Sequence, residues 1–321
     1  MIFIDKDKIE EIVNLQEMMN EMEHAFSLYK SGDFFMPERP FVENDNKKMI
    51  YMPCYTKDVI GTKILSIFPD NAKLNLPAID GVILLNDYTT GKPIALLDGQ
   101  SVTAFRTGAV GGVGIRHLSR KDASSVGIVG AGTQGFYQAL YACAARPIKT
   151  VYIYNHSDRD LSEYAARLKS KLTSYKSVNS NIEIIVCKEV RELVQKSDII
   201  CTATLSNTPV LPDDKDLLKG KCIIAVGSYT PDYREIPDAV FDLIDKVYIE
   251  LPYAMEESGD LAIPLKTNVI TKDKVALISD YLADNSDKEI KEGETTYFKS
   301  VGMALFDICA SRLLLEKAKE N

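Results

Sequence analysis

Several residue patterns that mark common classes of protein are missing from this sequence. It has only three histidines, none at the spacing of a metal site, and its six cysteines include no C-x-x-C pair. We therefore expect neither a metal centre nor a disulfide framework. The cysteines mostly stand in apolar runs, so we interpret them as small core residues.

Long apolar runs and an excess of basic residues are missing as well. No stretch of 18 or more apolar residues is free of charge, and the N-terminus is acidic where a secretory signal needs a basic end. The formal net charge of -8 argues against a protein that binds nucleic acid or an anionic membrane. We expect a cytoplasmic protein.

A glycine-rich turn between an apolar strand and a helical run is the strongest motif that is present. The strand at 126–129 leads into G-A-G-T-Q-G, which places Gly130, Gly132 and Gly135 at the G-x-G-x-x-G spacing. In such a unit the first glycine makes the turn, the second lets a pyrophosphate approach and the third lets helix and strand pack closely. The motif predicts a dinucleotide site at a helix N-terminus, where the helix dipole favours negative charge.

The pattern of elements changes near residue 125. Before it, short alternating stretches predict an antiparallel sheet, with a helix that starts at an Asp7 N-cap, includes 9–26 and ends at Gly32. A second helix is expected over 101–118. From Ser125 onward strands and helices alternate, which predicts an α/β, doubly wound parallel sheet. We expect 295–319 to form a helix that packs on the first domain, and the length of 321 residues favours two domains.

The residues after the second strand of the nucleotide domain bear on the choice of cofactor. An acid about twenty residues beyond the glycines would accept the ribose hydroxyls of NAD. Here Asn155, His156, Ser157, Asp158 and Arg159 follow V-Y-I-Y. Amide, hydroxyl and guanidinium groups can donate to a 2′-phosphate, so NADPH is weakly favoured over NADH. Asp158 weakens that preference, and an ordinary surface loop remains an alternative.

Three cations of the first domain stand in apolar or proline-flanked settings. Arg39 lies in P-E-R-P, Lys63 in V-I-G-T-K-I-L-S-I, and Arg106 opens R-T-G-A. Each alone would more often be a surface residue, but burying a lysine among aliphatic side chains is costly without a partner, and an anionic ligand would be one. An arginine fork matches a carboxylate, and a lysine whose pKa is lowered by burial suits proton transfer.

Motifs spread over nearly the whole chain point to one family. They are M-P-E-R-P, G-x-K-x-x-x-x-x-P-x-N (61–71), G-V-I-L-L-N-D, R-T-G-A, G-A-G-T-Q-G, T-A-T-x-S (202–206), V-G-S-Y-T-P-D-x-R-E (226–235) and F-K-S-V-G (298–302). Together they resemble the ornithine cyclodeaminase/mu-crystallin family. The resemblance implies a homodimer, a Rossmann dinucleotide domain at 121–299, and an α+β substrate and dimerisation domain from 1–120 and 300–321. It also implies NAD(P) and amino acids or imines of 2-oxo acids as ligands.

The resemblance assigns roles to individual residues. In the family, the residues that match Arg39, Lys63 and Arg106 hold the substrate carboxylate and assist proton transfer. Tyr229 is expected at the same cleft, as a proton donor or, preferably, as a wall of the pocket. The cofactor residues expected from these motifs are Thr107, Gly130, Gly132, Thr133, Gln134, Gly135, Asn155, His156, Ser157, Arg159, Thr202, Thr204, Val226 and Ser228.

Two departures separate the chain from the ornithine-cyclising members that it resembles. Those carry a Glu and an Asp where this sequence has Ile50 and Tyr229, and these carboxylates would bind the distal amine and take its proton. Imine reductases of the mu-crystallin type lack both and share the N-x-[ST] at 155–157.

These departures favour reduction of an imino acid or cyclic ketimine, or reversible oxidation of an amino acid. Arg39 and Arg106 would clamp the carboxylate in the interdomain crevice, against the nicotinamide, while Lys63 protonates the imine nitrogen. Ornithine cyclodeaminase proper and a non-catalytic, NADP-dependent binder remain alternatives.

Overall fold

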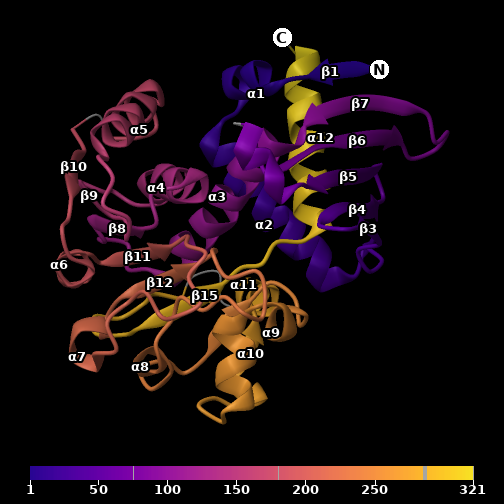
Figure 1. The fold of residues 1–321 in the computed structure, drawn as a ribbon. Helices are drawn as coiled ribbons and strands as arrows, with labels where there is room; N and C mark the ends of the chain where they lie inside the picture. The colour runs from indigo at the N-terminus through magenta and orange to yellow at the C-terminus, as the bar shows by residue number, and fades with distance from the viewer. Residues whose placement is uncertain (75, 180, 285–287, 321) are drawn as a thin grey trace. The chain divides into compact units, whose positions relative to one another are not determined.

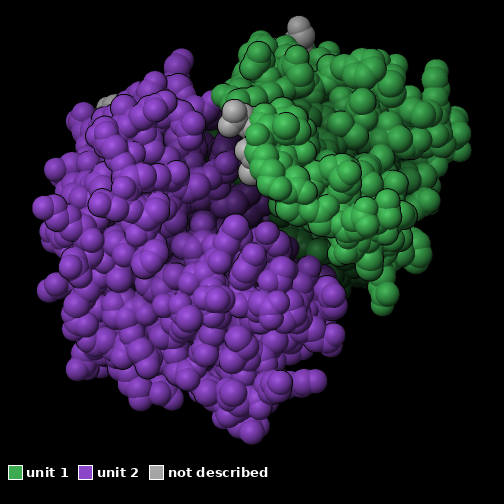
Figure 2. Space-filling view, in the orientation of Figure 1, with its two compact units in different colours: residues 1–106, 302–321 green, residues 107–301 purple. Residues whose placement is uncertain are grey.

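The computed structural model describes residues 1–74, 76–179, 181–284 and 288–320. The chain divides into two compact units, which Figure 2 colours separately. Unit 1 comprises Met1–Arg106 and Gly302–Asn321, and unit 2 comprises Thr107–Val301. The division falls inside helix α3 (Gly99–Leu118), so this helix contributes residues to both units.

Unit 1 is built on a seven-stranded sheet in the order β1-β7-β6-β5-β4-β2, with β3 also paired to β4. β1 runs parallel to β7 and the other pairs are antiparallel, so the predicted antiparallel character is confirmed. The strands are β1 (Ile2–Ile4), β2 (Phe34–Phe35), β3 (Phe41–Asn44), β4 (Lys47–Thr56), β5 (Val59–Ile67), β6 (Ile79–Asp87) and β7 (Pro93–Asp98), and a short 3-10 helix occupies Pro69–Leu74.

The C-terminal helix α12 (Ala304–Glu320) covers one face of this sheet. It packs against β4, β5 and β6 and against α2 (Leu15–Ser31), and Figure 1 shows it running across the strands. Side chains alternate along each strand, so Met52, Cys54, Ile83 and Leu85 are buried on the helix-covered face. The predicted return of the C-terminal helix to the first domain is confirmed.

The first helix does not begin at Asp7. Asp5 is the N-cap of α1 (Lys6–Ile12), and α2 has its own N-cap, Asn14, whose side chain accepts from the N–H groups of Gln16 and Glu17. The apolar helical pattern continues across this break, and the two caps, which satisfy orphan N–H groups, divide it. The predicted end at Gly32 is confirmed, because this residue closes α2 in the left-handed region with φ 75°.

The expected helix over 295–319 is wrong in its first part. Thr296–Lys299 forms β15, which lies between β12 and β13 in the sheet of unit 2. The sequence of a strand buried on both faces is a continuous apolar run. Periodicity alone does not distinguish such a run from a buried helix. Gly302, at φ 81°, then turns the chain before α12 starts at Ala304.

Unit 2 contains an eight-stranded, fully parallel sheet in the order β10-β9-β8-β11-β12-β15-β13-β14. This confirms the doubly wound prediction, and the chain order reverses at β8. The strands are β8 (Ser125–Val129), β9 (Thr150–Tyr154), β10 (Glu183–Val186), β11 (Ile199–Thr202), β12 (Cys222–Ala225), β13 (Val247–Ile249), β14 (Val275–Leu277) and β15.

Helices connect these strands and enclose the sheet. They are α4 (Thr133–Ala145), α5 (Ser162–Ser174), α6 (Val190–Lys196), α7 (Lys215–Leu218), α8 (Asp238–Phe241), α9 (Ala254–Glu257), α10 (Gly259–Lys266) and α11 (Ile278–Asp284), with a 3-10 turn at Lys272–Lys274. The six cysteines are buried and free, which confirms their interpretation as core residues. Within the described ranges, no helix combines the length and apolarity needed to cross a membrane.

Candidate active site

Lys63 is buried in unit 1, with a relative exposure of 2%. It lies on β5 on the same face as Val59 and Gly61, and this face is the one that α12 covers. Its Nζ lies 3.1 Å from Oδ1 of Asp307, and Arg106 on α3 donates from Nε to the same oxygen at 2.9 Å. Asp307 is fully buried on the first turn of α12, so a carboxylate of the protein itself compensates the buried lysine.

Arg39, the third predicted cation, is held beside this cluster by a hydrogen bond to Gly302. Arg39 donates from Nη2 to the carbonyl oxygen of Gly302 at 2.5 Å. A Cβ placed on Gly302 would lie 2.8 Å from Nη1 of Arg106, so the backbone here packs directly against that guanidinium. Its φ of 81° also disfavours other residues. Arg39 and Arg106 therefore meet the same glycine from different elements.

The charges of the cluster perturb one another. Burial lowers the pKa of Lys63 to about 8; Asp307 opposes this shift, while Arg106 and Arg39 add to it. Burial would raise the pKa of the Asp307 carboxyl, but Arg106 and Lys63 hold it below its usual value. Two cations thus share one carboxylate in unit 1 and a third, Arg39, lies close enough to affect Lys63, which suits an anionic ligand.

The glycine-rich loop of unit 2 has the geometry that a pyrophosphate needs. Gly130 has φ 105°, and a Cβ there would lie 2.5 Å from the carbonyl oxygen of Ala203. A Cβ on Gly135 would lie 2.0 Å from the carbonyl oxygen of Gly130, which shows how closely helix meets strand. Gly132, by contrast, is the N-cap of α4 and faces open space. The loop therefore leaves room only at the position where phosphates would approach the N–H groups of α4.

The predicted residues after β9 form one hydrogen-bonded group with this loop. Asn155 accepts from the backbone N–H of Ala131 at 3.0 Å and donates to Oγ of Ser157 at 2.6 Å. The guanidinium of Arg159 donates to the carbonyl oxygen of Ala131. His156 is exposed beside them. The amide of Asn155 thus shapes the turn, while Ser157 and Arg159 present donors at its edge.

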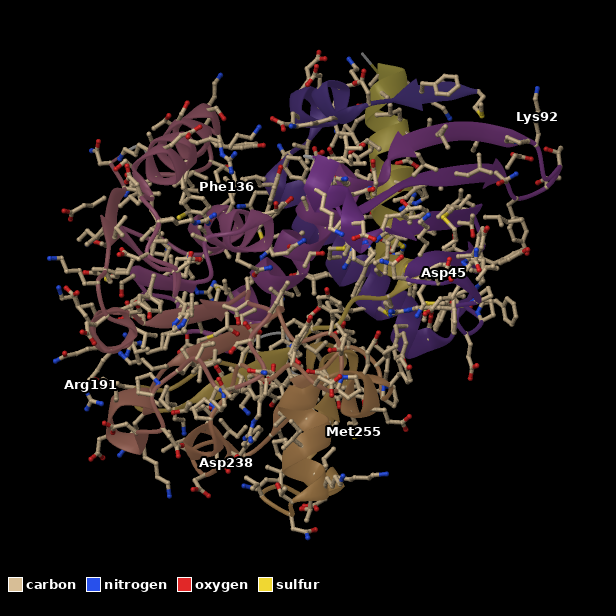
Figure 3. All side chains as sticks on the ribbon, viewed as in Figure 1. Asp45, Lys92, Phe136, Arg191, Asp238 and Met255 are labelled. Carbon is tan, nitrogen blue, oxygen red and sulfur yellow. The ribbon has the colours of Figure 1, made fainter. Side chains whose placement is uncertain are left out.

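A cavity of about 360 Å³ opens beside this group. Its cationic wall is Arg159 and Arg167, and the guanidinium of Arg167 lies 4.8 Å from the ring centre of Phe136, which Figure 3 labels. Acidic side chains also face the cavity. The lining residues are Ala131, Gly132, Thr133, Arg159, Asp160, Leu161, Glu163, Tyr164 and Arg167.

A buried carboxylate ties together the loops that follow β11 and β12. Glu235 accepts from the N–H and hydroxyl of Thr204 at 2.7 and 2.8 Å, and from the N–H groups of Gly227 and Ser228 at 2.8 and 3.2 Å. Asp260 in turn accepts from the N–H of Glu235 at 2.6 Å. Because β11 and β12 are adjacent parallel strands, Glu235 joins two loops at the ligand-binding edge of the sheet.

Three other predicted cofactor residues make structural contacts within unit 2. The hydroxyl of Ser228 bonds to the carbonyl oxygen of Tyr233 and lies 2.7 Å from Oγ of Ser258. Thr202 is fully buried on β11, and the N–H of Val226 donates to its carbonyl oxygen at 2.9 Å. These residues hold the strand ends in place, so contact with a cofactor would come from the neighbouring backbone.

The predicted residues fall into two groups by unit. Arg39, Lys63 and Arg106 come together in unit 1, whereas Tyr229 belongs to unit 2, where its ring lies 5.8 Å from that of Tyr233.

Thr107 is the first residue of unit 2, and its carbonyl oxygen accepts from the side chain of Gln138 at 3.0 Å. Thr133 and Gln134 open α4 beside the glycine loop. The roles of all these residues stay predictions.

The sequence analysis overlooked Asp307, Glu235 and Gly302. Asp307 stands in the apolar run M-A-L-F-D-I-C-A, so the argument applied to Lys63, a charge among aliphatic residues, would also have selected it. Glu235 and Gly302 lie inside recognised motifs, but nothing in one sequence shows that Glu235 joins the loops after β11 and β12 or that Gly302 packs against Arg106.

This chain is similar to known proteins over its whole length. The model of the ornithine cyclodeaminase/mu-crystallin family matches residues 2–321. A Δ1-pyrroline-2-carboxylate reductase of Bacillus cereus is 31% identical over 332 residues, covering 100% of this chain and 98% of its own.

Two solved structures have the same fold. Thermococcus litoralis Δ1-pyrroline-2-carboxylate reductase, in complex with NADH and L-proline, is 32% identical with a TM-score of 0.89, covering 100% of this chain and 98% of its own. An archaeal alanine dehydrogenase dimer with bound NAD is 26% identical with a TM-score of 0.86, covering 99% and 96%. The chain therefore belongs to the ornithine cyclodeaminase/mu-crystallin family.

Proposed function

We propose that this protein is an NAD(P)H-dependent enzyme that reduces the C=N bond of a carboxylate-bearing cyclic ketimine, or oxidises the corresponding amino acid in reverse. Δ1-Pyrroline-2-carboxylate is the first candidate, since relatives about 30% identical over the whole chain reduce it. The observation that carries the proposal is the buried group of Lys63, Arg106 and Asp307 in unit 1, with the half-buried Arg39 held at Gly302 beside it.

The arginines bind the substrate carboxylate in this proposal. Because Nε of Arg106 already donates to Asp307, the carboxylate would meet the terminal amino groups of its guanidinium. Arg39, held at the carbonyl oxygen of Gly302, adds a second cation at the same glycine. Two arginines from different elements fix the orientation of a small planar acid, which makes the reaction a positioned step.

Lys63 is the proton donor. A pKa of about 8 keeps most of its ammonium groups protonated at neutral pH, yet makes the proton easier to release than from an ordinary lysine. Protonation of the imine nitrogen makes the neighbouring carbon a better hydride acceptor. Tyr229 would wall the pocket, and burial raises the pKa of its phenol, which favours the neutral form.

The nicotinamide cofactor supplies or accepts the hydride when it is bound. The open face of Gly132 and the N–H groups of α4 would hold its pyrophosphate, and Thr107 and the loops joined by Glu235 would support the rest. Ser157, Arg159 and Arg167 offer donors to a 2′-phosphate, so NADPH stays the weakly preferred form, although the solved relatives hold NADH and NAD.

The face of the sheet around Lys63 favours ketimine reduction over ornithine cyclisation. On β4, Ile50 lies on the same face as Met52, which pairs with Lys63 in the register of β4 and β5. An aliphatic side chain therefore occupies the position where the ornithine-cyclising members that this chain resembles carry a glutamate. A distal amine would meet no carboxylate there.

A homodimer is also part of the proposal, and the outward face of the unit 1 sheet supports it. Several positions that alternate with the buried core residues are apolar but only half-buried or exposed. Register pairs Tyr51 with Ile64 and Ile64 with Val82, so these side chains form one continuous strip. The alanine dehydrogenase with the same fold is a dimer.

One assay panel tests the function. The protein is mixed with NADPH or NADH and, separately, with Δ1-pyrroline-2-carboxylate, pyruvate plus ammonia, or ornithine, while the nicotinamide absorbance is followed. Oxidation of the cofactor with the ketimine and formation of proline are expected. Proline and ammonia from ornithine without net use of cofactor would identify a cyclodeaminase, and tight cofactor binding without turnover of any substrate would identify a binder.

A further inference from the structure

We propose that Asp307 is a positioning residue that places both Lys63 and Arg106 for the reaction. This inference rests on the proposed function and goes beyond it, because Asp307 would touch neither substrate nor cofactor. Its Oδ1 alone receives Nζ of Lys63 at 3.1 Å and Nε of Arg106 at 2.9 Å. Its Oδ2 is buried and makes no hydrogen bond among the described residues.

Asp307 orients the guanidinium of Arg106 together with Gly302. A hydrogen bond at Nε fixes one edge of the guanidinium plane, and the backbone of Gly302 closes against Nη1 and Nη2. These contacts leave the guanidinium little rotational freedom. An arginine that is held before its ligand arrives loses less side-chain entropy on binding the carboxylate.

Asp307 also sets the charge state of Lys63. The charged groups that act on Lys63 are Asp307 from α12, Arg106 from α3 and Arg39 from the segment before β3. Cys54 from β4 is close enough to Asp307 to be affected by its charge. Burial and the Asp307 carboxylate raise the pKa of Cys54 to about 12, so this thiol is neutral. Among the described residues that shift the pKa of Lys63, Asp307 is therefore the anion, and Arg106 and Arg39 are cations.

Removal of this charge changes the pH dependence in a defined direction. In Asp307→Asn, burial and the two arginines still lower the pKa of Lys63, and no carboxylate opposes them. The pKa of Lys63 should fall by about 1 to 3 units, the usual effect of an opposite charge at this distance. Lys63 must be protonated to act as the proton donor. The alkaline limb of the pH profile, where the rate of ketimine reduction falls, should therefore move to lower pH by the same amount.

The test compares pH profiles of kcat and KM for the wild type, Asp307→Asn and a matched control. The control is Glu21→Gln, which removes a partly buried carboxylate of α2 that pairs with Arg312 of α12 at 2.8 Å. Asp307→Asn should shift the alkaline limb, recover activity as the pH falls and raise KM, while Glu21→Gln should change none of these. The inference would be overturned if the pH profile of Asp307→Asn had the same shape and midpoint as that of the wild type and differed only in the overall rate.

A second comparison covers the case in which Asp307→Asn does not fold. This comparison uses Lys63→Met and the double variant Lys63→Met/Asp307→Asn. The two differ only in whether Asp307 can hold Arg106, and neither leaves a buried lysine without a counter-ion. L-Proline should bind the NADH complex of the double variant at least about tenfold more weakly than that of Lys63→Met, as loss of a charge-assisted contact predicts. Equal affinity would contradict the positioning of Arg106.

A direct titration separates this inference from the proposed function. NMR of protein labelled at the lysine ε-carbon, with the Lys63 signal assigned by its loss in Lys63→Met, measures its pKa without any turnover. Should the wild type reduce no ketimine, the proposed function fails. Should the wild type be active while the pKa of Lys63 is the same in Asp307→Asn, the inference about Asp307 fails.

Discussion

Each unit contains a fully buried carboxylate at its candidate site, and the two have opposite kinds of partner. Asp307 in unit 1 accepts from the side chains of two cations. Glu235 in unit 2 accepts from three backbone N–H groups and one hydroxyl. The first carboxylate thus controls groups that titrate and bind charge, while the second fixes the course of two loops.

The pKa shifts follow the same division. Arg106 and Lys63 outweigh burial at Asp307 and lower its pKa. At Glu235, burial and then the nearby Asp260 carboxylate raise the pKa. All four groups facing the oxygens of Glu235 are donors, so ionised Glu235 satisfies them best. Substitutions at the two sites should therefore separate effects on proton transfer from effects on cofactor binding.

The largest effect should come from Lys63→Met, which removes the proposed proton donor. A general acid contributes about 100-fold or more, so kcat for ketimine reduction should fall at least that far at neutral pH. Steady-state kinetics with Lys92→Met as the control measures this, because Lys92 is exposed in the β6–β7 hairpin, where Figure 3 labels it. A loss of threefold or less would remove Lys63 from the mechanism.

Gly302→Ala should come next. It forces a side chain into a backbone of φ 81° and against Nη1 of Arg106. Gly293→Ala is a matched control, because Gly293 has the same φ of 81° but open space at the Cβ position. Both should lose about 1–2 kcal/mol of stability from backbone strain, measured by denaturant unfolding.

Only Gly302→Ala should also disturb the arginine that binds substrate. Its KM for the ketimine should rise at least about tenfold, the loss expected for a charged hydrogen bond, while Gly293→Ala keeps the wild-type KM. Similar KM values in the two variants would mean that the contact with Arg106 carries no binding energy.

Glu235→Gln should weaken the cofactor and spare the pH profile. The amide group of glutamine would point an N–H toward other donors, so one of the two loops must move. The KM for NADH should rise about tenfold, within the range for a disturbed buried carboxylate, and the alkaline limb of kcat should stay in place. A shift of that limb would break the distinction between the two carboxylates.

The last effect is on stability at alkaline pH. Lys63 has a pKa of about 8 in the folded protein and 10.5 as an ordinary lysine. Between these values the unfolded chain binds more protons, so the free energy of unfolding should gain from Lys63 as the pH rises through this window. Lys63→Met should lack this gain, which urea unfolding at several pH values measures as a difference in slope.

Local patterns were sufficient to predict the glycine loop and the two kinds of sheet. The turn around Gly130 depends on neighbours in sequence, and the three cations were visible because charges stand out in apolar runs. The pairing of Asp307 with Lys63 and Arg106 could not be predicted, because Asp307 lies 244 positions from Lys63 and 201 from Arg106 and only the return of α12 brings them together. Strand β15 was missed for a different reason. A strand buried on both faces is a continuous apolar run, without the alternation of polar and apolar residues that identifies a strand. The site roles and a cytoplasmic location stay predictions.

The course of the chain through unit 1 has a consequence for biosynthesis. Residues 1–106 leave the ribosome first, but Gly302 and Asp307, which complete their charged cluster, follow only after all of unit 2. A nascent chain that ends before Gly302 therefore exposes the sheet face that α12 later covers and keeps Lys63 without its counter-ion. Maturation of the protein must wait for its last helix, and truncations there should be handled by the cell as unfolded protein.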